Sequence, residues 1–203
     1  CDMTVSAAKS GYHSGEVGGI VPETFRVCRE LLSRLDDPLT GKVIDELHTE
    51  MPAYARPEAE RMVALAGKEM CTKYSMNDNV KYMNEDDLVE MYLNNTWRPN
   101  LSITGAGGLP NYQRAGNVVR ASTALRLSMR LPPNMDANKA CSIVRSKLTT
   151  DVPYNCKVEL EGDHNGNGWC MKEPASWLDE IMNSASKHFY NGKDYGSYGM
   201  GGS

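Results

Sequence analysis

Apolar and polar residues alternate strictly between residues 122 and 131, and this period of two predicts a β-strand. Its apolar face comprises Leu125, Leu127, Met129 and Leu131. The opposite face is small or polar and carries Arg126 and Arg130. We therefore expect a central strand that is buried on one side only. Pro132 and Pro133 should end it, because proline has no N–H to donate to a neighbouring strand.

Three shorter segments show a similar pattern and are interpreted as further strands. Met3, Val5 and Ala7 alternate with small polar residues near the start of the chain. Residues 101–104 form a second short apolar segment, which Gly105 closes. Residues 156–161 alternate again, and Pro153 precedes them. Together with residues 122–131, these segments predict a sheet of four strands.

Two segments have the spacing of amphipathic helices. The first follows Pro22, and its apolar stripe comprises Phe25, Cys28, Leu31, Leu32 and Leu35. The second follows Asp136, which is a favourable N-cap residue. Its apolar face comprises Ala140, Ile143, Val144 and Leu148. Both helices should pack on the buried face of the sheet.

Residues 38–98 have the least regular pattern. Helical periodicity is visible in residues 57–69 and 85–93, with a polar segment between them. Each helical segment is too short to build a core alone. We interpret this block as a mostly helical insertion that packs on the domain.

The resulting order is strand, helix, insertion, strand, strand, helix, strand. This order predicts an α+β fold, a ferredoxin-like βαββαβ sandwich spanning residues 1–161 and interrupted by the insertion at 38–98. The helices would cover one face of the sheet. The other face would stay open, and an open face of this kind is commonly an interface.

The composition changes after residue 161. A glycine-rich link leads to a predicted helix at 176–189, whose apolar side comprises Trp177, Ile181, Ala185 and Phe189. Residues 162–203 are therefore assigned to part of a second domain. The chain begins inside an apparent strand and stops at Gly-Gly-Ser, so we expect it to be a piece of a longer protein.

The net charge, the hydropathy and the cysteines indicate which partners and which compartment are to be expected. A net charge of −4 argues against a nucleic-acid partner, because phosphate binding needs a basic surface. No apolar run approaches the roughly 20 residues that span a bilayer, so no membrane partner is expected. The six cysteines have no CxxC spacing, and Cys28 and Cys141 fall on apolar helix faces. A reducing cytoplasm is favoured, although an even count leaves disulfides open.

Few residues stand out as candidates for chemistry. The four histidines form no HxH or HExxH motif, so no metal site is predicted in this chain. His13 lies in a glycine-rich loop at 11–19, where it could act in a site or be a solvated turn residue. Arg126 and Arg130 could bind a carboxylate through the planar guanidinium, or serve only as solvated charges.

Several motifs carry a resemblance to a known family. They are the segments at 12–19 (YHSGEVGG), 96–105 (TWRPNLSITG), 116–119 (GNVV), 125–133 (LRLSMRLPP) and 201–203 (GGS). In this order they resemble the carnosinase and acetylornithine deacetylase family of cocatalytic zinc peptidases and amidohydrolases. The long block before Trp97 is similar to the dipeptidase branch. Two departures are Gly11-Tyr12 in place of the family's Asp-Leu, and Met200 in place of a Glu.

The resemblance implies that residues 1–161 form a lid domain that makes a homodimer, and that 162–203 return to an α/β catalytic domain. His13 matches a lid histidine that reaches into the partner subunit's site and polarises the scissile carbonyl. Asn117 and Arg130 match residues that hold the substrate's carboxylate. Residues of the loop that lines the substrate pocket are matched by Gly201, Gly202 and Ser203.

The family's two metal ions, zinc or manganese, are held by residues outside the segment that this chain matches. The resemblance therefore implies a metal-dependent dipeptidase acting on dipeptides or small amides, with this segment alone binding no metal and hydrolysing nothing. Two alternatives stay open. The chain could be a non-catalytic dimerisation module, in which Arg126 and Arg130 pair with acidic residues of the partner. It could also belong to a deacetylase or deacylase of the same family.

Overall fold

The computed structural model describes residues 1–162, 165–197 and 199, and the chain divides into two compact units. The first, here called the sheet unit, comprises Cys1–His48, Pro99–Leu131 and Met135–Asn167. The second, here called the helical unit, comprises Thr49–Arg98, Pro132–Asn134 and Gly168–Ser203. Most of the predicted insertion, residues 49–98, thus groups with the end of the chain, whereas residues 38–48 belong to the sheet unit.

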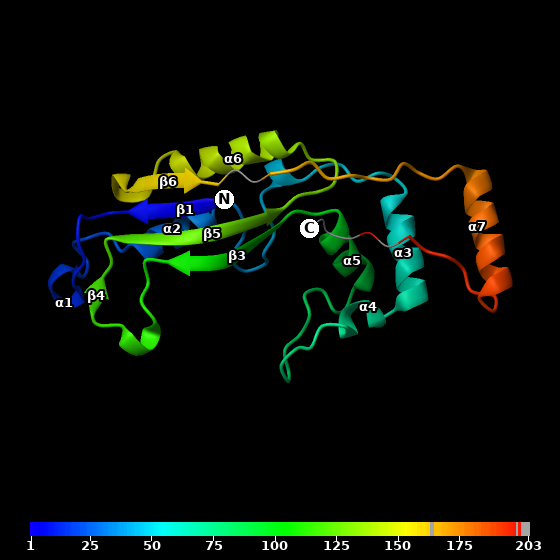
Figure 1. The fold of residues 1–203 in the computed structure, drawn as a ribbon, viewed down its shortest axis with the longest axis horizontal. Coiled ribbons are helices and arrows are strands. Elements are labelled where there is room, and N and C mark those ends of the chain that lie inside the picture. The colour runs from blue at the N-terminus through cyan, green and yellow to red at the C-terminus, as the bar shows by residue number, and fades with distance from the viewer. Residues whose placement is uncertain (163–164, 198, 200–203) are drawn as a thin grey trace. The chain divides into compact units, whose positions relative to one another are not determined.

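The sheet unit is built on four antiparallel strands (Figure 1). The strands are β1 (Asp2–Ser6), β3 (Asn100–Gly107), β5 (Ser122–Arg130) and β6 (Lys157–Glu161). Their order across the sheet is β3-β5-β1-β6, so that β1 lies between β5 and β6. With one helix after β1 and one after β5, this is the ferredoxin-like βαββαβ arrangement, and the predicted α+β fold is confirmed.

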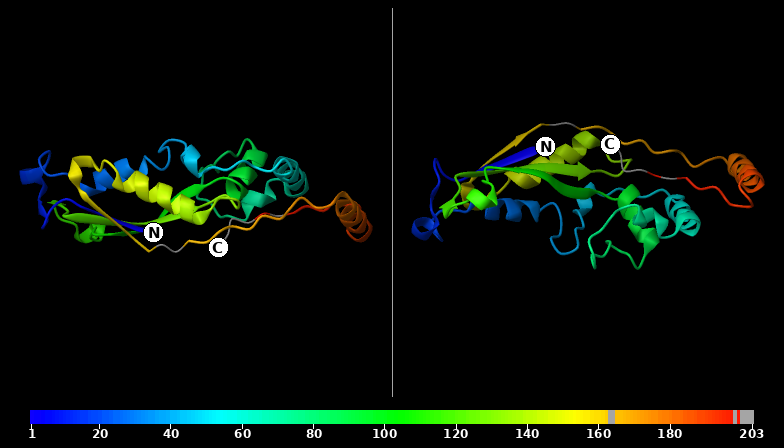
Figure 2. Two further views of the ribbon diagram at one scale, coloured as in Figure 1. Left: turned by 90° about the horizontal axis from the view of Figure 1, so that it is seen from above. Right: turned by 60° about the horizontal axis from the view of Figure 1, so that its bottom comes forward.

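Both long helices of the sheet unit, α2 (Thr24–Leu32) and α6 (Ala137–Thr149), cover the same face of the sheet (Figure 2). The register places Met3 opposite Leu125, and both side chains are buried there. The predicted alternation of β5 is confirmed, because Leu125 and Leu127 are buried whereas Arg126 is exposed. Val27, Cys28 and Leu31 of α2 and Leu148 of α6 complete this core.

The buried stripe of α2 differs from the predicted one. Phe25 is 40% exposed, and the fully buried Thr24 occupies the core position instead. The carboxylate of Glu23 caps the helix by accepting the N–H groups of Phe25 and Arg26. The buried face then follows positions 24, 27, 28 and 31, and residue 25 lies about 100° around the helix from residue 24.

Arg34, just beyond α2, ties the two helices together. Its guanidinium donates to the carbonyl oxygens of Thr150 at 2.7 Å and Asp151 at 2.9 Å, which follow the C-terminus of α6. A cation at this position satisfies carbonyl groups that the helix leaves without partners. The predicted N-cap at the other end of α6 is confirmed, since Asp136 accepts the N–H of Lys139.

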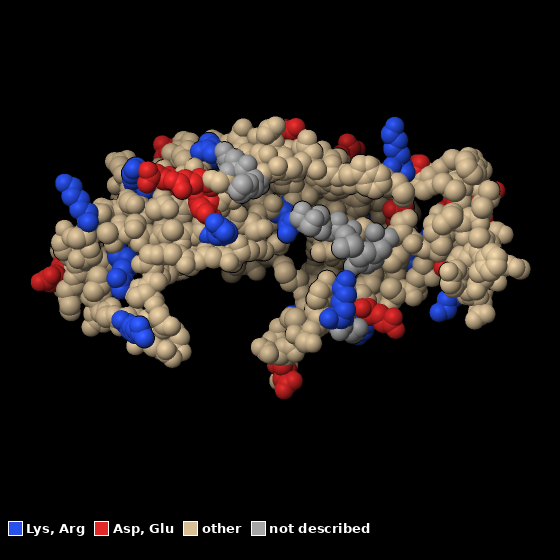
Figure 3. Space-filling view, viewed as in Figure 1, with Lys and Arg blue, Asp and Glu red and all other residues tan. Residues whose placement is uncertain are grey.

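The opposite face of the sheet is polar. Arg126 makes a bidentate ion pair with Asp2 on the neighbouring strand, with both N–O distances at 2.7 Å. Lys157 pairs with Glu159 on β6 at 2.6 Å. Figure 3 shows basic and acidic side chains close together over the strands. These charges largely neutralise one another within the chain.

Two features of the sheet unit were not predicted. A small ribbon joins β2 (Tyr12–His13) to β4 (Val118–Val119), and the short helix α1 (Ser14–Val17) follows it. β3 is also longer than the predicted segment 101–104, with a bulge between Ile103 and Gly105. Three single turns of 3-10 helix complete the unit: η1 (Asp45–Leu47), η2 (Tyr112–Arg114) and η3 (Pro153–Asn155).

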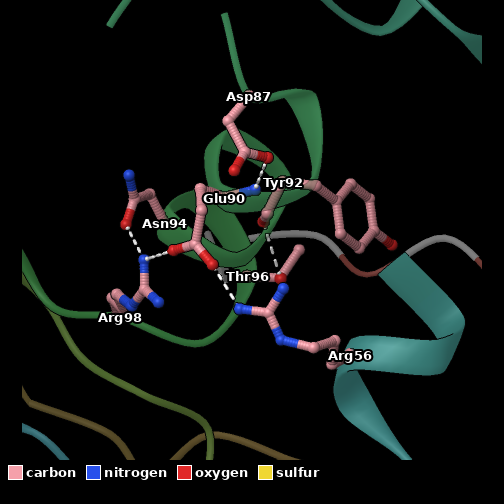
Figure 4. Close-up of polar contacts among 7 residues, drawn as sticks. All are labelled: Arg56, Asp87, Glu90, Tyr92, Asn94, Thr96 and Arg98. Carbon is pink, nitrogen blue, oxygen red and sulfur yellow. Dashed lines mark hydrogen bonds and ion pairs between the residues drawn. The ribbon is translucent and has the colours of Figure 1, made fainter. Parts of the chain in front are cut away.

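The helical unit contains α3 (Ala55–Ala66), α4 (Glu69–Thr72), α5 (Leu88–Thr96) and α7 (Ser176–Phe189). Both predicted helices of the insertion are present, with boundaries shifted by two or three residues. Their core is small and comprises Ala59, Tyr92 and Leu93, with Met51, Met62 and Trp97 against it. Glu90 links the two helices by pairing with Arg56 of α3 and with Arg98 beyond α5 (Figure 4).

The last helix, α7, has the predicted boundaries, and its apolar side is exposed. Trp177, Ile181 and Phe189 are 61, 57 and 75% exposed. Its clearest side-chain anchor is Asp179, which pairs with Arg61 of α3 at 3.0 Å. The apolar stripe is therefore present in the sequence but not covered by the described part of the chain.

The two cysteines that were predicted on apolar helix faces differ in burial. Cys28 is fully buried as predicted, and burial, followed by the nearby Glu23 carboxylate, raises the pKa of its thiol to about 11. Cys141 is only partly buried, because the amide of Asn165 and solvent meet its side of α6. Among the described residues, no helix has both the length and the apolar character to cross a membrane.

Candidate functional site

His13 is held at one end of the sheet unit by the β2–β4 ribbon (Figure 1). It pairs with Val118, and its own backbone forms the N-cap of α1. The side chain is exposed, and its Nδ1 accepts the backbone N–H of Gly15 at 3.1 Å. The imidazole is thus accessible to a ligand, while one of its nitrogens is engaged by the protein.

Asn117 lies beside His13 because of the same ribbon. Its carbonyl oxygen accepts the N–H of Ser14 at 2.8 Å, and the residue itself is exposed. Gly11 permits the close approach of these two segments, since a Cβ there would lie 2.7 Å from Cγ1 of Val118. Two of the predicted site residues, about a hundred positions apart in the sequence, are therefore brought together.

Arg130 occupies the other end of the sheet. It is the last residue of β5, lies opposite Asn100 of β3, and is exposed. The strand from Ser122 to Arg130 spans about 26 Å, given the rise per residue of a β-strand. His13 and Asn117 are connected to the start of that strand, so a single copy of the sheet unit does not bring Arg130 together with them.

The loop residues Gly201, Gly202 and Ser203 lie outside the described residues. The segment just before them is anchored in the helical unit by Tyr92 of α5. Its hydroxyl donates to the carbonyl of Ser197 at 3.2 Å and accepts the N–H of Gly199 at 2.8 Å. Tyr92 lies within the predicted helical segment 85–93, and only its hydroxyl could have indicated this role from the sequence.

In the helical unit, the side chains of Asp179 and Tyr54 have shifted pKa values. A hydrogen bond from Tyr195 and the adjacent Arg61 lower the pKa of the Asp179 carboxyl. Burial, followed by contact with Cys170, raises the pKa of the Tyr54 hydroxyl to about 12. Tyr54 is therefore neutral at ordinary pH and donates to the carbonyl of Met171 at 2.6 Å. These groups hold the end of the chain to α3 and form no catalytic cluster.

A metal centre of the kind that the resembled family uses needs several acidic, histidine or cysteine side chains close together. Within residues 1–162, 165–197 and 199, no three of them are grouped as a metal site would require. Nδ1 of His13 already accepts the N–H of Gly15. The described residues of this chain do not fit a metal centre.

Comparison with family models gives no match. The curated proteins give relatives in yeasts, of which two are described here. The chain is 28% identical to the Cys-Gly metallodipeptidase DUG1 of Saccharomyces cerevisiae over 92% of its length, which is 39% of that protein. It is 23% identical to the corresponding protein of Schizosaccharomyces pombe, again over about two fifths of the relative. The chain thus spans about two fifths of the length of the curated relatives it matches.

Three solved structures match this chain along its whole length. The dipeptidase Dug1p of Saccharomyces cerevisiae matches with a TM-score of 0.63 at 25% identity, and the chain covers 42% of it. Human carnosine dipeptidase 1 matches with a TM-score of 0.63 at 17% identity, covered to 43%. The M20 family metallo-carboxypeptidase Sso-CP2 of Sulfolobus solfataricus matches with a TM-score of 0.68 at 14% identity, covered to 51%.

The last two structures show the likeness of fold, whereas the sequence relatives and Dug1p add detectable identity along almost the entire chain. The motifs around His13, Asn117 and Arg130 lie within the matched length. The chain is therefore similar, along almost its entire length, to one part of the yeast metallodipeptidases.

Proposed function

We propose that this chain is a part of a metal-dependent dipeptidase that hydrolyses peptide bonds. Its sequence relatives are named metallodipeptidases, and the chain spans about two fifths of their length. In this proposal, residues 1–161 are the lid domain, which forms a homodimer, and residues 162–203 belong to the catalytic domain. Two zinc or manganese ions would be held by residues outside this chain, and the whole protein would work in the cytoplasm.

The observation that carries the proposal is the position of His13 relative to Arg130. Both are exposed, but they belong to opposite ends of the sheet unit. A symmetric pair of chains can bring His13 of one protomer to Arg130 of the other, because a twofold axis reverses the direction of the sheet. This geometry supports a site that is completed by two subunits.

Each proposed residue has a chemical task in such a site. His13 donates a hydrogen bond to the oxygen of the scissile carbonyl, where negative charge develops during hydrolysis. Arg130 binds the carboxylate of the dipeptide through its planar guanidinium, and Asn117 contributes a polar contact. Gly201, Gly202 and Ser203 would belong to the loop that lines the substrate pocket. The substrate is thereby recognised by its charged end and activated at its amide.

Replacing His13 tests this proposal in the full-length protein. The variant His13→Ala should lower kcat by roughly 10²–10³ with little change in KM, as expected for the loss of one oxyanion donor. Metal content, measured by elemental analysis, should equal that of the wild type, because His13 is not a ligand in the proposal. Wild-type turnover by His13→Ala would remove His13 from the mechanism.

A second variant controls for damage to the fold. In His13→Asn, the side-chain oxygen can accept the N–H of Gly15 and keep the cap of α1, but it cannot reach the carbonyl. His13→Asn should therefore be as slow as His13→Ala while keeping wild-type thermal stability. A variant that is slow only when it is also unstable would point to a structural role.

The choice between a dipeptidase and a deacylase rests on the substrate. Rates with a dipeptide and with an N-acyl amino acid should be compared in the same full-length preparation. The proposal expects the dipeptide to have the higher kcat/KM. The remaining alternative, a non-catalytic dimerisation module, expects no hydrolysis of either. It also expected Arg126 to pair with a partner's acid, whereas Arg126 is engaged by Asp2 of its own chain.

A further inference from the structure

The hydrogen bond between Gly15 and His13 determines where the imidazole carries its proton. A backbone N–H can only donate, so Nδ1 of His13, which lies 3.1 Å from it, must be the acceptor. In the neutral ring, an unprotonated Nδ1 leaves the proton on Nε2. Among residues 1–162, 165–197 and 199, no hydrogen-bond partner faces Nε2. Its N–H therefore remains available to a ligand.

Gly15 also limits the position of the ring. A Cβ at residue 15 would lie 3.1 Å from Nδ1 and 3.2 Å from Cε1 of His13. These distances are tighter than ordinary van der Waals contacts, so the imidazole would have to move. The φ angle of Gly15 is not positive, and its backbone is one that any residue can adopt. The space occupied by the ring, rather than the turn, requires glycine here.

The backbone on both sides of this contact is held in place. The ribbon pairs His13 with Val118, and the N–H of Ser14 is bonded to Asn117. The carbonyl of Ser14 accepts the N–H of Gly18 at 2.9 Å, which closes the turn of α1 around Gly15. The donor at Gly15 and the base of the imidazole are thus fixed relative to each other.

We infer that Gly15 is a positioning residue, which holds His13 as the Nε2–H tautomer and sets the direction of its donor. The inference rests on the proposed function for its catalytic consequence, because a donor aimed at a carbonyl is useful only if Nε2 carries the proton. Without the N–H of Gly15, both tautomers would be accessible, and only one of them can donate from Nε2.

The tautomer can be observed without any assay of activity. The full-length protein is labelled with ¹⁵N at histidine, and its two-bond ¹H–¹⁵N correlations are recorded at about pH 8.5, where an ordinary imidazole is neutral. The signals of His13 are those missing from the His13→Asn variant. The inference expects an unprotonated Nδ1 and a protonated Nε2. A protonated Nδ1 would overturn it.

Kinetics then test the consequence. Gly15→Ala keeps the N–H but displaces the ring, so kcat should fall at least about ten-fold while KM stays within about two-fold. Gly166→Ala is the matched control, because a Cβ there meets nothing within 4 Å and its φ is not positive. The control should keep the wild-type kcat, and both variants should keep the wild-type melting temperature.

The two hypotheses fail in different ways. Wild-type kcat in Gly15→Ala, when His13→Ala is slow, would overturn the role of Gly15 and leave the proposed function standing. Wild-type kcat in His13→Ala would overturn the proposed function, whatever tautomer is observed. A slow Gly15→Ala variant in which the ¹H and ¹⁵N chemical shifts of the His13 ring equal those of the wild type would show that the ring has not moved, and would also overturn the positioning role.

Discussion

Two threonine hydroxyls meet inside the otherwise apolar core of the sheet unit. Oγ1 of Thr24, at the start of α2, lies 2.8 Å from Oγ1 of Thr123 on β5, and both residues are fully buried. One hydroxyl donates and the other accepts, so each has the partner that a buried polar group needs. The pair fixes the start of α2 over the central strand.

Removing both hydroxyls should cost less than the sum of removing each one alone. Thr123→Val leaves the Thr24 hydroxyl buried without a partner, and should lower the free energy of unfolding by about 1–3 kcal/mol. The double variant Thr24→Val/Thr123→Val should lose less than the sum of the single changes. Urea-induced unfolding measured by circular dichroism gives the comparison. Strict additivity would show that the two hydroxyls do not depend on each other.

For single residues, burial could be predicted from the sequence where it follows from local spacing. Leu125 and Leu127 are buried and Arg126 is exposed because a strand alternates its faces. Phe25 was misplaced because the cap at Glu23 selects which positions of the helix face the core. The anchoring role of Tyr92 depends on a contact with Gly199, more than a hundred residues away, which no local pattern contains.

At the scale of secondary-structure elements, a charged cluster around Glu90 links the helices α3 and α5. Oε2 of Glu90 lies 2.6 Å from Nη1 of Arg98, and Oε1 contacts the guanidinium of Arg56 (Figure 4). Asp87 caps the same helix by accepting the N–H of Glu90. The apolar core between α3 and α5 contains few buried side chains, so this cluster carries a correspondingly large share of their attachment.

The pKa of the Glu90 carboxyl is lowered, first by Arg56 and then by Arg98. A carboxyl with a lowered pKa in the folded state contributes stability above its unfolded pKa, about 4.3, and loses it as the pH falls through the lowered value. Glu90→Gln should therefore destabilise α5 by about 1 kcal/mol at pH 7, with a difference that shrinks below about pH 4.3. Hydrogen exchange of the α5 amides measures this directly.

The pair Lys81–Glu85 provides a control in the same unit, at 3.2 Å, and its lysine side chain is 80% exposed. Glu85→Gln removes one ion pair with this exposed lysine, and should leave the exchange of the α5 amides unchanged. Equal effects of the two substitutions would mean that net charge, rather than the two arginines around Glu90, determines the stability of α5.

The order of elements was predictable because α2, α6 and the four strands each carry a local period, and the βαββαβ topology follows from that order. The β2–β4 ribbon was not predictable, since two residues on each strand hold too little periodicity to be recognised. That ribbon places His13 beside Asn117. The candidate site was therefore indicated by resemblance of motifs, and its local geometry came only with the structure.

For the whole molecule, the separation of His13 from Arg130 leads to a test by mixed dimers. His13→Ala and Arg130→Ala versions of the full-length protein are co-expressed with different tags, and the mixed dimer is isolated. If each site takes His13 from one subunit and Arg130 from the other, the mixed dimer has one intact site and should recover about half of the wild-type kcat/KM. Both parent dimers should be nearly inactive.

A site formed within one subunit gives a different result. Each half of the mixed dimer would then contain one defect, and its kcat/KM would be as low as that of the parents. A mixed dimer of two wild-type chains carrying the same two tags is the reference for full activity. The measurement thus separates the two arrangements without any structure of the dimer.

The central position of β1 has a consequence for the time course of folding. Its neighbours pair Asp2 with Arg126 on one side and with Glu161 on the other, so β1 waits for strands that are synthesised more than a hundred residues later. Contacts this distant along the chain slow folding, and the nascent β1 is exposed to wrong pairing in the meantime. A chaperone that shields extended apolar segments during translation would be expected to bind the nascent chain until β6 has emerged.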